Sequence, residues 1–120
     1  MANILIVDDA QTDRELLGKV VSSAGHVPVY ASDGSQALAK AKSSAPALVF
    51  LDVVMPGANG FETCRSLKTD TTTKGIPVVL VTSKSTPSDK FWAQKQGADG
   101  LIPKPFTPDS ITETIRRFVK

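Results

Sequence analysis

Apolar and polar residues follow one another in blocks along the chain, and the blocks predict alternating strands and helices. Short apolar runs occupy residues 4–7, 27–31, 47–53, 77–82 and 100–104. Three of them (ILIV, ALVFLDV and PVVLVT) do not alternate with polar positions, which is typical of strands covered by helices on both faces. Longer segments with apolar residues at helical spacing separate and follow these runs.

The helical segments carry start and stop signals. Thr12 to Glu15 has the form of a capping box. Thr86 and Thr107 each place a capping hydroxyl before a proline, and Gly25 and Gly97 stand where helices are expected to end. The expected core faces are Leu16, Leu17, Val20, Val21 and Ala24; Ala37, Leu38, Ala41 and Ala45; Phe61, Cys64 and Leu67; and Ile111, Ile115, Phe118 and Val119.

Strict alternation of strand and helix over residues 1–120 predicts one α/β domain of the doubly wound (βα)5 type. Its five-stranded parallel sheet is expected in the flavodoxin-like order 2-1-3-4-5. No repeat, linker or shift in composition divides the chain. Pro103 has no backbone donor, so the fifth strand is expected at the edge of the sheet.

Composition excludes several classes of protein. Hydrophobic residues make up 41% and charged residues 22% of the chain, as in ordinary globular domains. One cysteine excludes a disulfide framework, no signal peptide is visible, and no apolar stretch is long enough for membrane insertion, so a location in the cytoplasm is expected. The chain is also expected to be a monomer. The net charge of +2 is small, and the basic cluster of Arg116, Arg117 and Lys120 suits a helix end better than nucleic-acid binding.

Polar residues collect where the predicted strands end. Asp8 and Asp9 follow the first strand, Asp52 lies at the end of the third, Thr82 ends the fourth, and Lys104 ends the fifth. A parallel sheet brings these ends to one edge, where crowded carboxylates recruit a cation. A pocket rich in carboxylate oxygens suits Mg²⁺. Each residue alone also has a structural explanation, as a turn, a cap or a surface lysine.

Together, these residues suit phosphoryl transfer. Asp52 interrupts a run that would otherwise be core, and a carboxylate can attack phosphorus to give an aspartyl phosphate. Mg²⁺ and the Lys104 ammonium would neutralise the developing charge, and Thr82 would donate its hydroxyl to a phosphoryl oxygen.

Two alternatives come from other classes. A small aspartyl-phosphate phosphatase would need a general acid at position 54, where Val54 stands. A flavodoxin-like cofactor-binding module would need hydroxyls and glycines after the first strand to hold phosphate, but Asp8 and Asp9 stand there.

Four motifs spread over the whole chain are ILIVDD, LDVVMPGANGFE, VLVTSK and GADGLIPKPF. With them the sequence resembles the response-regulator receiver family, which includes single-domain chemotaxis receivers. The resemblance implies that Asp52 is the phosphoacceptor, that Asp8, Asp9, Asp52 and the Val54 backbone carbonyl bind Mg²⁺, and that the Lys104–Pro105 peptide is cis.

The same resemblance implies that Thr82 is the switch hydroxyl and that Lys104 contacts the phosphoryl group. It implies a chemotaxis-type histidine kinase as phosphodonor, self-phosphorylation and self-dephosphorylation as the chain's only catalysis, and a protein target docking on the fourth helix, fifth strand and fifth helix. Residues 88–98, SDKFWAQKQGA, are similar to the receivers of type IV pilus chemosensory systems, which govern twitching motility. Leu101 stands where the family often has a switch aromatic.

Four residues are expected outside the site. His26 is expected in a turn, and Cys64 is expected to act as a small core hydrophobe. Of the adjacent Phe91 and Trp92, one is expected to fill core and the other to be exposed for a partner.

Overall fold

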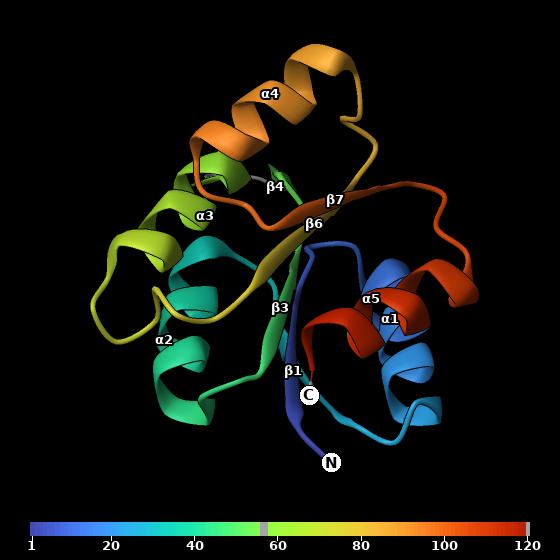
Figure 1. Cartoon of the computed structure of the whole chain (residues 1–120). Helices are drawn as coiled ribbons and strands as arrows, with labels where there is room; N and C mark the ends of the chain where they lie inside the picture. The colour runs from blue at the N-terminus through green and yellow to red at the C-terminus, as the bar shows by residue number, and fades with distance from the viewer. Residues whose placement is uncertain (56–57, 120) are drawn as a thin grey trace.

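The computed structural model describes residues 1–55 and 58–119. Its centre is a five-stranded parallel sheet (Figure 1). The strands are β1 (Asn3–Val7), β2 (Val27–Ala31), β3 (Leu48–Leu51), β6 (Val78–Thr82) and β7 (Gly100–Pro103). Their spatial order is β2-β1-β3-β6-β7, and every neighbouring pair is parallel. The predicted fold class and strand order are confirmed.

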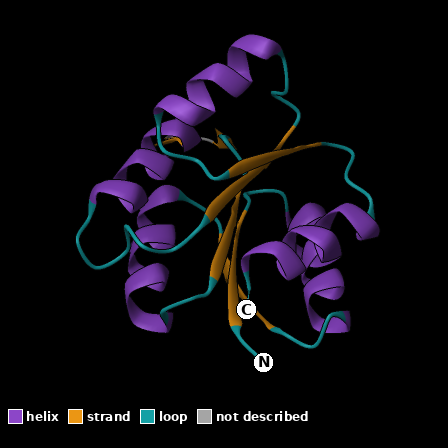
Figure 2. Ribbon diagram, in the orientation of Figure 1, coloured by secondary structure: helices purple, strands orange, loops and turns teal. Residues whose placement is uncertain are grey.

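Helices cover both faces of this sheet (Figures 1 and 2). The helices α1 (Gln11–Ser23) and α5 (Pro108–Phe118) lie on one face, and α2 (Gly34–Ser44), α3 (Gly60–Thr69) and α4 (Pro87–Lys95) lie on the other. No helix among the described residues has the length and apolar content needed to cross a membrane.

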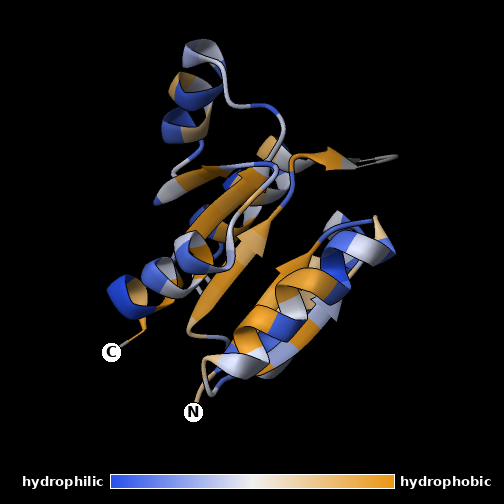
Figure 3. Cartoon of the chain, turned by 90° about the vertical axis from the view of Figure 1, so that its right-hand side faces the viewer, coloured by the Kyte–Doolittle hydropathy of each residue, from blue (hydrophilic) through white to orange (hydrophobic). Residues whose placement is uncertain are grey.

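Each face of the sheet has its own hydrophobic core, because successive strand residues point to opposite sides. In β1, Leu5 packs into the cluster under α2 and α3, while Ile4 and Ile6 pack into the cluster under α1 and α5. Figure 3 shows the hydrophobic colour concentrated on the central strands. The unbroken apolar runs in the sequence are thus explained by burial on both faces.

Most of the helix signals are confirmed. Thr86 and Thr107 are N-caps whose side chains accept hydrogen bonds from the backbone N–H three residues later. Gly25 and Gly97 each have a φ of 88° directly after a helix, a left-handed conformation that costs glycine no steric strain.

The capping box predicted for the first helix is wrong. The helix α1 begins earlier, with Ala10 as N-cap and no side-chain cap, so Thr12 lies inside its first turn. Leu16 was expected in the core but is 48% exposed. Ala45, expected on the core face of α2, is instead its C-cap, with a φ of 44°.

The segment after β3 differs from the prediction. β3 ends at Leu51, so Asp52 follows the strand instead of lying inside it. A short antiparallel hairpin of β4 (Val54–Met55) and β5 (Ala58–Asn59) precedes α3 and was not predicted. Pro56 of the second motif and Lys120 of the basic cluster lie outside the described residues.

Both edge strands of the sheet contain a proline, Pro28 in β2 and Pro103 in β7. The edge position expected for the fifth strand is confirmed. The Lys104 amide, directly after Pro103, donates to the Thr82 carbonyl at 2.9 Å. The backbone of Lys104 is therefore tied to the end of β6.

The two aromatic residues of α4 are both exposed. Phe91 and Trp92 each retain 55% of their accessible surface, so the expectation that one fills core is wrong. The helix is short and buries only Ala93. The two rings pack edge to face against each other, with centroids 6.1 Å apart, and the Lys95 ammonium lies 5.3 Å from the Phe91 centroid.

Cys64 is fully buried on α3, as expected for a small core hydrophobe. Its Sγ lies 3.7 Å from the Gln96 carbonyl oxygen. Burial raises the pKa of the Cys64 thiol from 9.0 to about 11, because the core solvates a thiolate poorly.

This pKa predicts how stability changes in alkali. Between pH 9 and 11 the unfolded thiol ionises while the folded thiol does not, so the free energy of unfolding should fall as pH rises. In Cys64→Ala this loss is absent. The stability difference between wild type and Cys64→Ala should therefore shrink by about 2 kcal/mol from pH 8 to pH 11 in urea unfolding. A constant difference would show that the thiol titrates normally in the fold.

Candidate functional site

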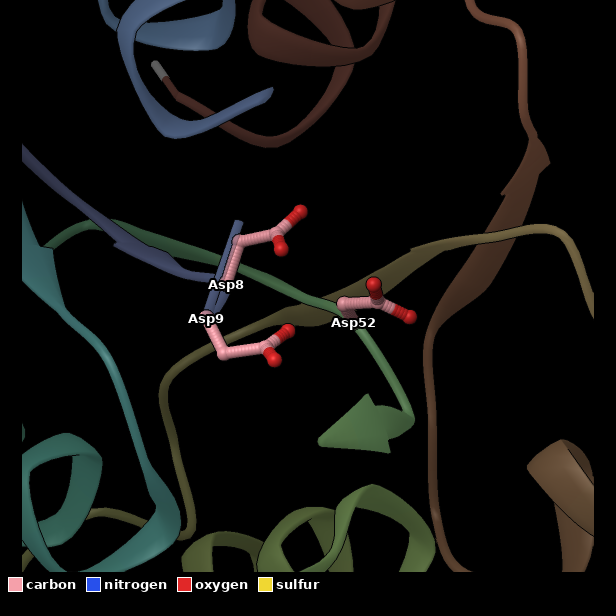
Figure 4. A group of neighbouring side chains, drawn as sticks. All are labelled: Asp8, Asp9 and Asp52. Carbon is pink, nitrogen blue, oxygen red and sulfur yellow. The ribbon is translucent and has the colours of Figure 1, made fainter. Parts of the chain in front are cut away.

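Three carboxylates meet at the carboxyl edge of the sheet. Asp8 and Asp9 directly follow β1, and Asp52 directly follows β3, its neighbour in the sheet. One oxygen from each lies within 4.8 Å of the others. Figure 4 shows the three side chains close together at these two strand ends, all extending to the same side. The crowding expected from the sequence is present.

Backbone hydrogen bonds hold two of these carboxylates in place. Oδ1 of Asp8 accepts from the Ala10 amide at 2.9 Å, and Oδ1 of Asp52 accepts from the Val54 amide at 3.0 Å. Arg14 Nη1 donates to the backbone carbonyl of Asp8 at 2.8 Å. Asp8 and Asp52 are buried while Asp9 is exposed, so the pocket opens to water on the side of Asp9.

Lys104, which directly follows β7, binds this acidic group through its ammonium. Its ammonium donates to Oδ2 of Asp8 at 2.8 Å, Oδ2 of Asp13 at 2.9 Å and Oδ2 of Asp52 at 3.0 Å. These three bonds use every N–H of the ammonium. The Lys104–Pro105 peptide bond is cis, as the resemblance implied.

The burial of this cluster changes the pKa of two groups. Burial raises the pKa of the Asp8 carboxyl, although hydrogen bonds from Lys104 and the Ala10 amide act in the opposite direction. Burial alone would lower the pKa of the Lys104 ammonium, but its bonds to Asp8, Asp13 and Asp52 outweigh burial and raise it. Lys104 therefore stays protonated and offsets part of the negative charge.

Thr82 lies at the end of β6, between the strands that carry Asp52 and Lys104. It is fully buried, and its Oγ1 accepts from the Lys84 amide at 3.2 Å. The hydroxyl is thus engaged by the loop that follows its own strand. In this bond the oxygen of Thr82 accepts, so its O–H remains a donor.

The donor set fits a hard divalent cation. The Asp8, Asp9 and Asp52 oxygens are of the kind that Mg²⁺ prefers, and their spacing allows one ion to reach all of them. Leu101, in place of an aromatic, is partly buried against the core under α2, α3 and α4. His26 accepts from the Ala2 amide at 3.1 Å near the start of β1, which confirms its turn position away from the acids.

Two residues of the site were missed in the sequence. Asp13 binds Lys104 and Arg14 binds the Asp8 carbonyl, and both lie in the first turns of α1. Their position in the sequence could have indicated this role, because a helix that follows β1 begins beside the carboxyl edge of the sheet. Assigning this stretch to a capping box hid it.

Comparisons with known proteins agree with this geometry. The family model of the response regulator receiver domain matches residues 4–116. Protein PilH of Pseudomonas aeruginosa is 40% identical over 115 residues, which is 96% of this chain and 95% of PilH. The DNA-binding response regulator MtrA of Mycolicibacterium smegmatis is 37% identical over 113 residues, which is 94% of this chain but 48% of MtrA.

A solved structure supports the same assignment. The chemotaxis protein CheY4 of Vibrio cholerae superposes with a TM-score of 0.93 at 32% identity, and the alignment covers 99% of both chains. The match spans nearly the full length of CheY4 and PilH, with the acidic strand ends inside the matched region. The chain belongs to the response regulator receiver family.

Proposed function

We propose that this chain is a response regulator of a two-component phosphorelay, phosphorylated on Asp52 by a histidine kinase. The observation that carries the proposal is the group of Asp8, Asp9 and Asp52 with Lys104 across it. Packing alone does not require such a group, because each buried carboxylate costs free energy of desolvation. Membership of the receiver family supports this function over the two alternatives, a phosphatase and a flavodoxin-like cofactor-binding module.

In the proposed reaction, a carboxylate oxygen of Asp52 attacks the phosphorus of a phosphohistidine. A P–O bond forms, the P–N bond breaks, and the imidazole nitrogen of the donor keeps the electron pair. Asp8, Asp9, Asp52 and the Val54 backbone carbonyl would hold Mg²⁺, which supplies positive charge beside the phosphoryl oxygens. Lys104 is already placed to move its ammonium from the Asp52 carboxylate to a phosphoryl oxygen.

The proposed response to phosphorylation begins at Thr82. Its hydroxyl would donate to a phosphoryl oxygen, and because its oxygen accepts from the Lys84 amide, it would draw the loop after β6 toward Asp52. That loop leads directly into α4, whose Phe91 and Trp92 are exposed. The reshaped surface of α4, β7 and α5 would then bind a protein target.

The pathway is a further part of the proposal. Similarity to PilH and to a chemotaxis protein, together with residues 88–98, favours a pilus-linked chemosensory system that controls twitching motility. The phosphodonor would then be a chemotaxis-type kinase. A cytoplasmic monomer fits the reduced, buried Cys64 and the prolines of the sheet edges.

The proposal is tested by incubating the chain with a small acyl-phosphate donor and Mg²⁺ and measuring its intact mass. We expect the mass of one added phosphoryl group, and no addition when a chelator replaces Mg²⁺. A mass that stays unchanged at millimolar donor and Mg²⁺ would contradict the function. Phosphotransfer from an unrelated kinase but not from a pilus chemosensory kinase would contradict the pathway alone.

A further inference from the structure

Lys104 is shared by three carboxylates, and only two of them belong to the group that fits a metal ion. Asp8 and Asp52 are common to both sets, while Asp13 contacts Lys104 and lies outside the metal-binding group. Asp13 comes from α1, and its side chain is 36% exposed at the rim of the pocket. The lysine and an incoming divalent cation therefore need the same two carboxylates.

We infer that Asp13 is a positioning residue that keeps Lys104 paired when Asp8 and Asp52 turn to a divalent cation, and so raises the affinity of the site for that cation. The inference rests on the proposed function, because that function supplies the cation.

Among the described residues, Lys104 has three carboxylate partners, and a divalent cation would need two of them. The Lys104 side chain is only 16% exposed, so its ammonium would lose ion pairing without regaining full hydration if Asp8 and Asp52 were withdrawn. With Asp13 present, it keeps one charged acceptor at 2.9 Å that the cation does not use. Without Asp13, every charged partner of the ammonium is one that the cation needs.

The backbone geometry makes Asp13 suited to this role. Lys104 is fixed at its amide by the Thr82 carbonyl, so its side chain can swing but its Cα stays in place. Asp13 lies in the first turn of α1, directly after the loop that carries Asp8 and Asp9. The lysine can thus be retained beside the site without moving a strand or a helix.

The test is a calorimetric titration with Mg²⁺ alone, at one ionic strength and without any phosphodonor. Asp13→Asn should weaken Mg²⁺ binding by roughly three- to ten-fold, the range expected for a partly exposed charge pair. Glu15→Gln is the matched control, because it removes the same charge from the same helix and the Glu15 carboxylate accepts from the Gln11 side chain, away from Lys104. That variant should change the affinity less than about two-fold.

Measurements in the Lys104→Met variant distinguish an effect of Asp13 on Lys104 from a general effect of its negative charge. In Lys104→Met there is no ammonium to hold, so adding Asp13→Asn should change the Mg²⁺ affinity no more than Glu15→Gln does. Circular dichroism melts of each variant check that the fold is intact.

The outcomes distinguish the two levels of the proposal. If wild type binds no Mg²⁺, the proposed function fails and this inference fails with it. If wild type binds Mg²⁺ and Asp13→Asn binds it equally well, only the inference fails. A loss that is as large in the Lys104→Met background as in wild type would also overturn it, because the effect would then be one of charge alone.

Discussion

Asp52→Asn should abolish the uptake of phosphate from an acyl-phosphate donor, reducing it from one phosphoryl group per chain to none. The amide nitrogen and oxygen of asparagine are far weaker nucleophiles than a carboxylate, and the proposed function places the phosphoryl group on Asp52 alone. Intact-mass measurement at saturating donor and Mg²⁺ reads the result directly.

The variant should keep its fold, so the loss reports chemistry. An asparagine oxygen can still accept from the Val54 amide, and Lys104 keeps Asp8 and Asp13 as partners. Asp109→Asn, on the exposed first turn of α5, removes a carboxylate elsewhere and should accept phosphate like wild type. Equal phosphorylation of Asp52→Asn and wild type would show that another residue is the acceptor.

Gly60→Ala should lower the free energy of unfolding by about 3 kcal/mol, near the upper end for overpacking. A Cβ on Gly60 would lie 2.1 Å from the Cα of Val53 and 2.6 Å from the carbonyl oxygen of Asp52. Both are backbone atoms directly at the site, so no side-chain rotation relieves the clash. The gain in helix propensity on replacing glycine is about 1 kcal/mol and cannot compensate.

Thermal and urea unfolding measure this effect, and a fall in melting temperature of roughly 10 °C is expected. Gly75→Ala is the matched control, because a Cβ there meets no atom within 4 Å, and its stability should stay within about 0.5 kcal/mol of wild type. Because the displaced backbone carries Asp52, the folded fraction of Gly60→Ala should also accept phosphate more slowly. Equal stability of the two variants would refute the close approach of α3 to this loop.

The sequence was sufficient for the fold because its signals are local and repeated. Buried strands must be apolar on both faces, and capping threonines and terminal glycines mark the helix ends, so the strand order followed from general rules of parallel sheets. The grouping of Asp8, Asp9 and Asp52 followed from the same rules, since carboxyl ends of neighbouring strands share an edge.

The features that the sequence did not predict depend on contacts between distant segments. Asp13 and Lys104 are 91 positions apart, and no periodicity reports such a pair. Leu16 was placed in the core because helical spacing cannot define the limits of a buried face. It instead lines a groove of about 490 Å³ beside Lys104 and Phe106. The exposure of both Phe91 and Trp92 depends on how little of α4 the sheet covers.

The proline in each edge strand limits how the sheet can associate with other chains. In β2 the Val27 amide donates inward to the Ala2 carbonyl, so the next position, Pro28, faces outward and has no N–H to offer. β7 ends in Pro103. A strand of a second molecule could not form a continuous set of hydrogen bonds with either edge strand. High protein concentration should therefore not drive these sheets to associate into fibres.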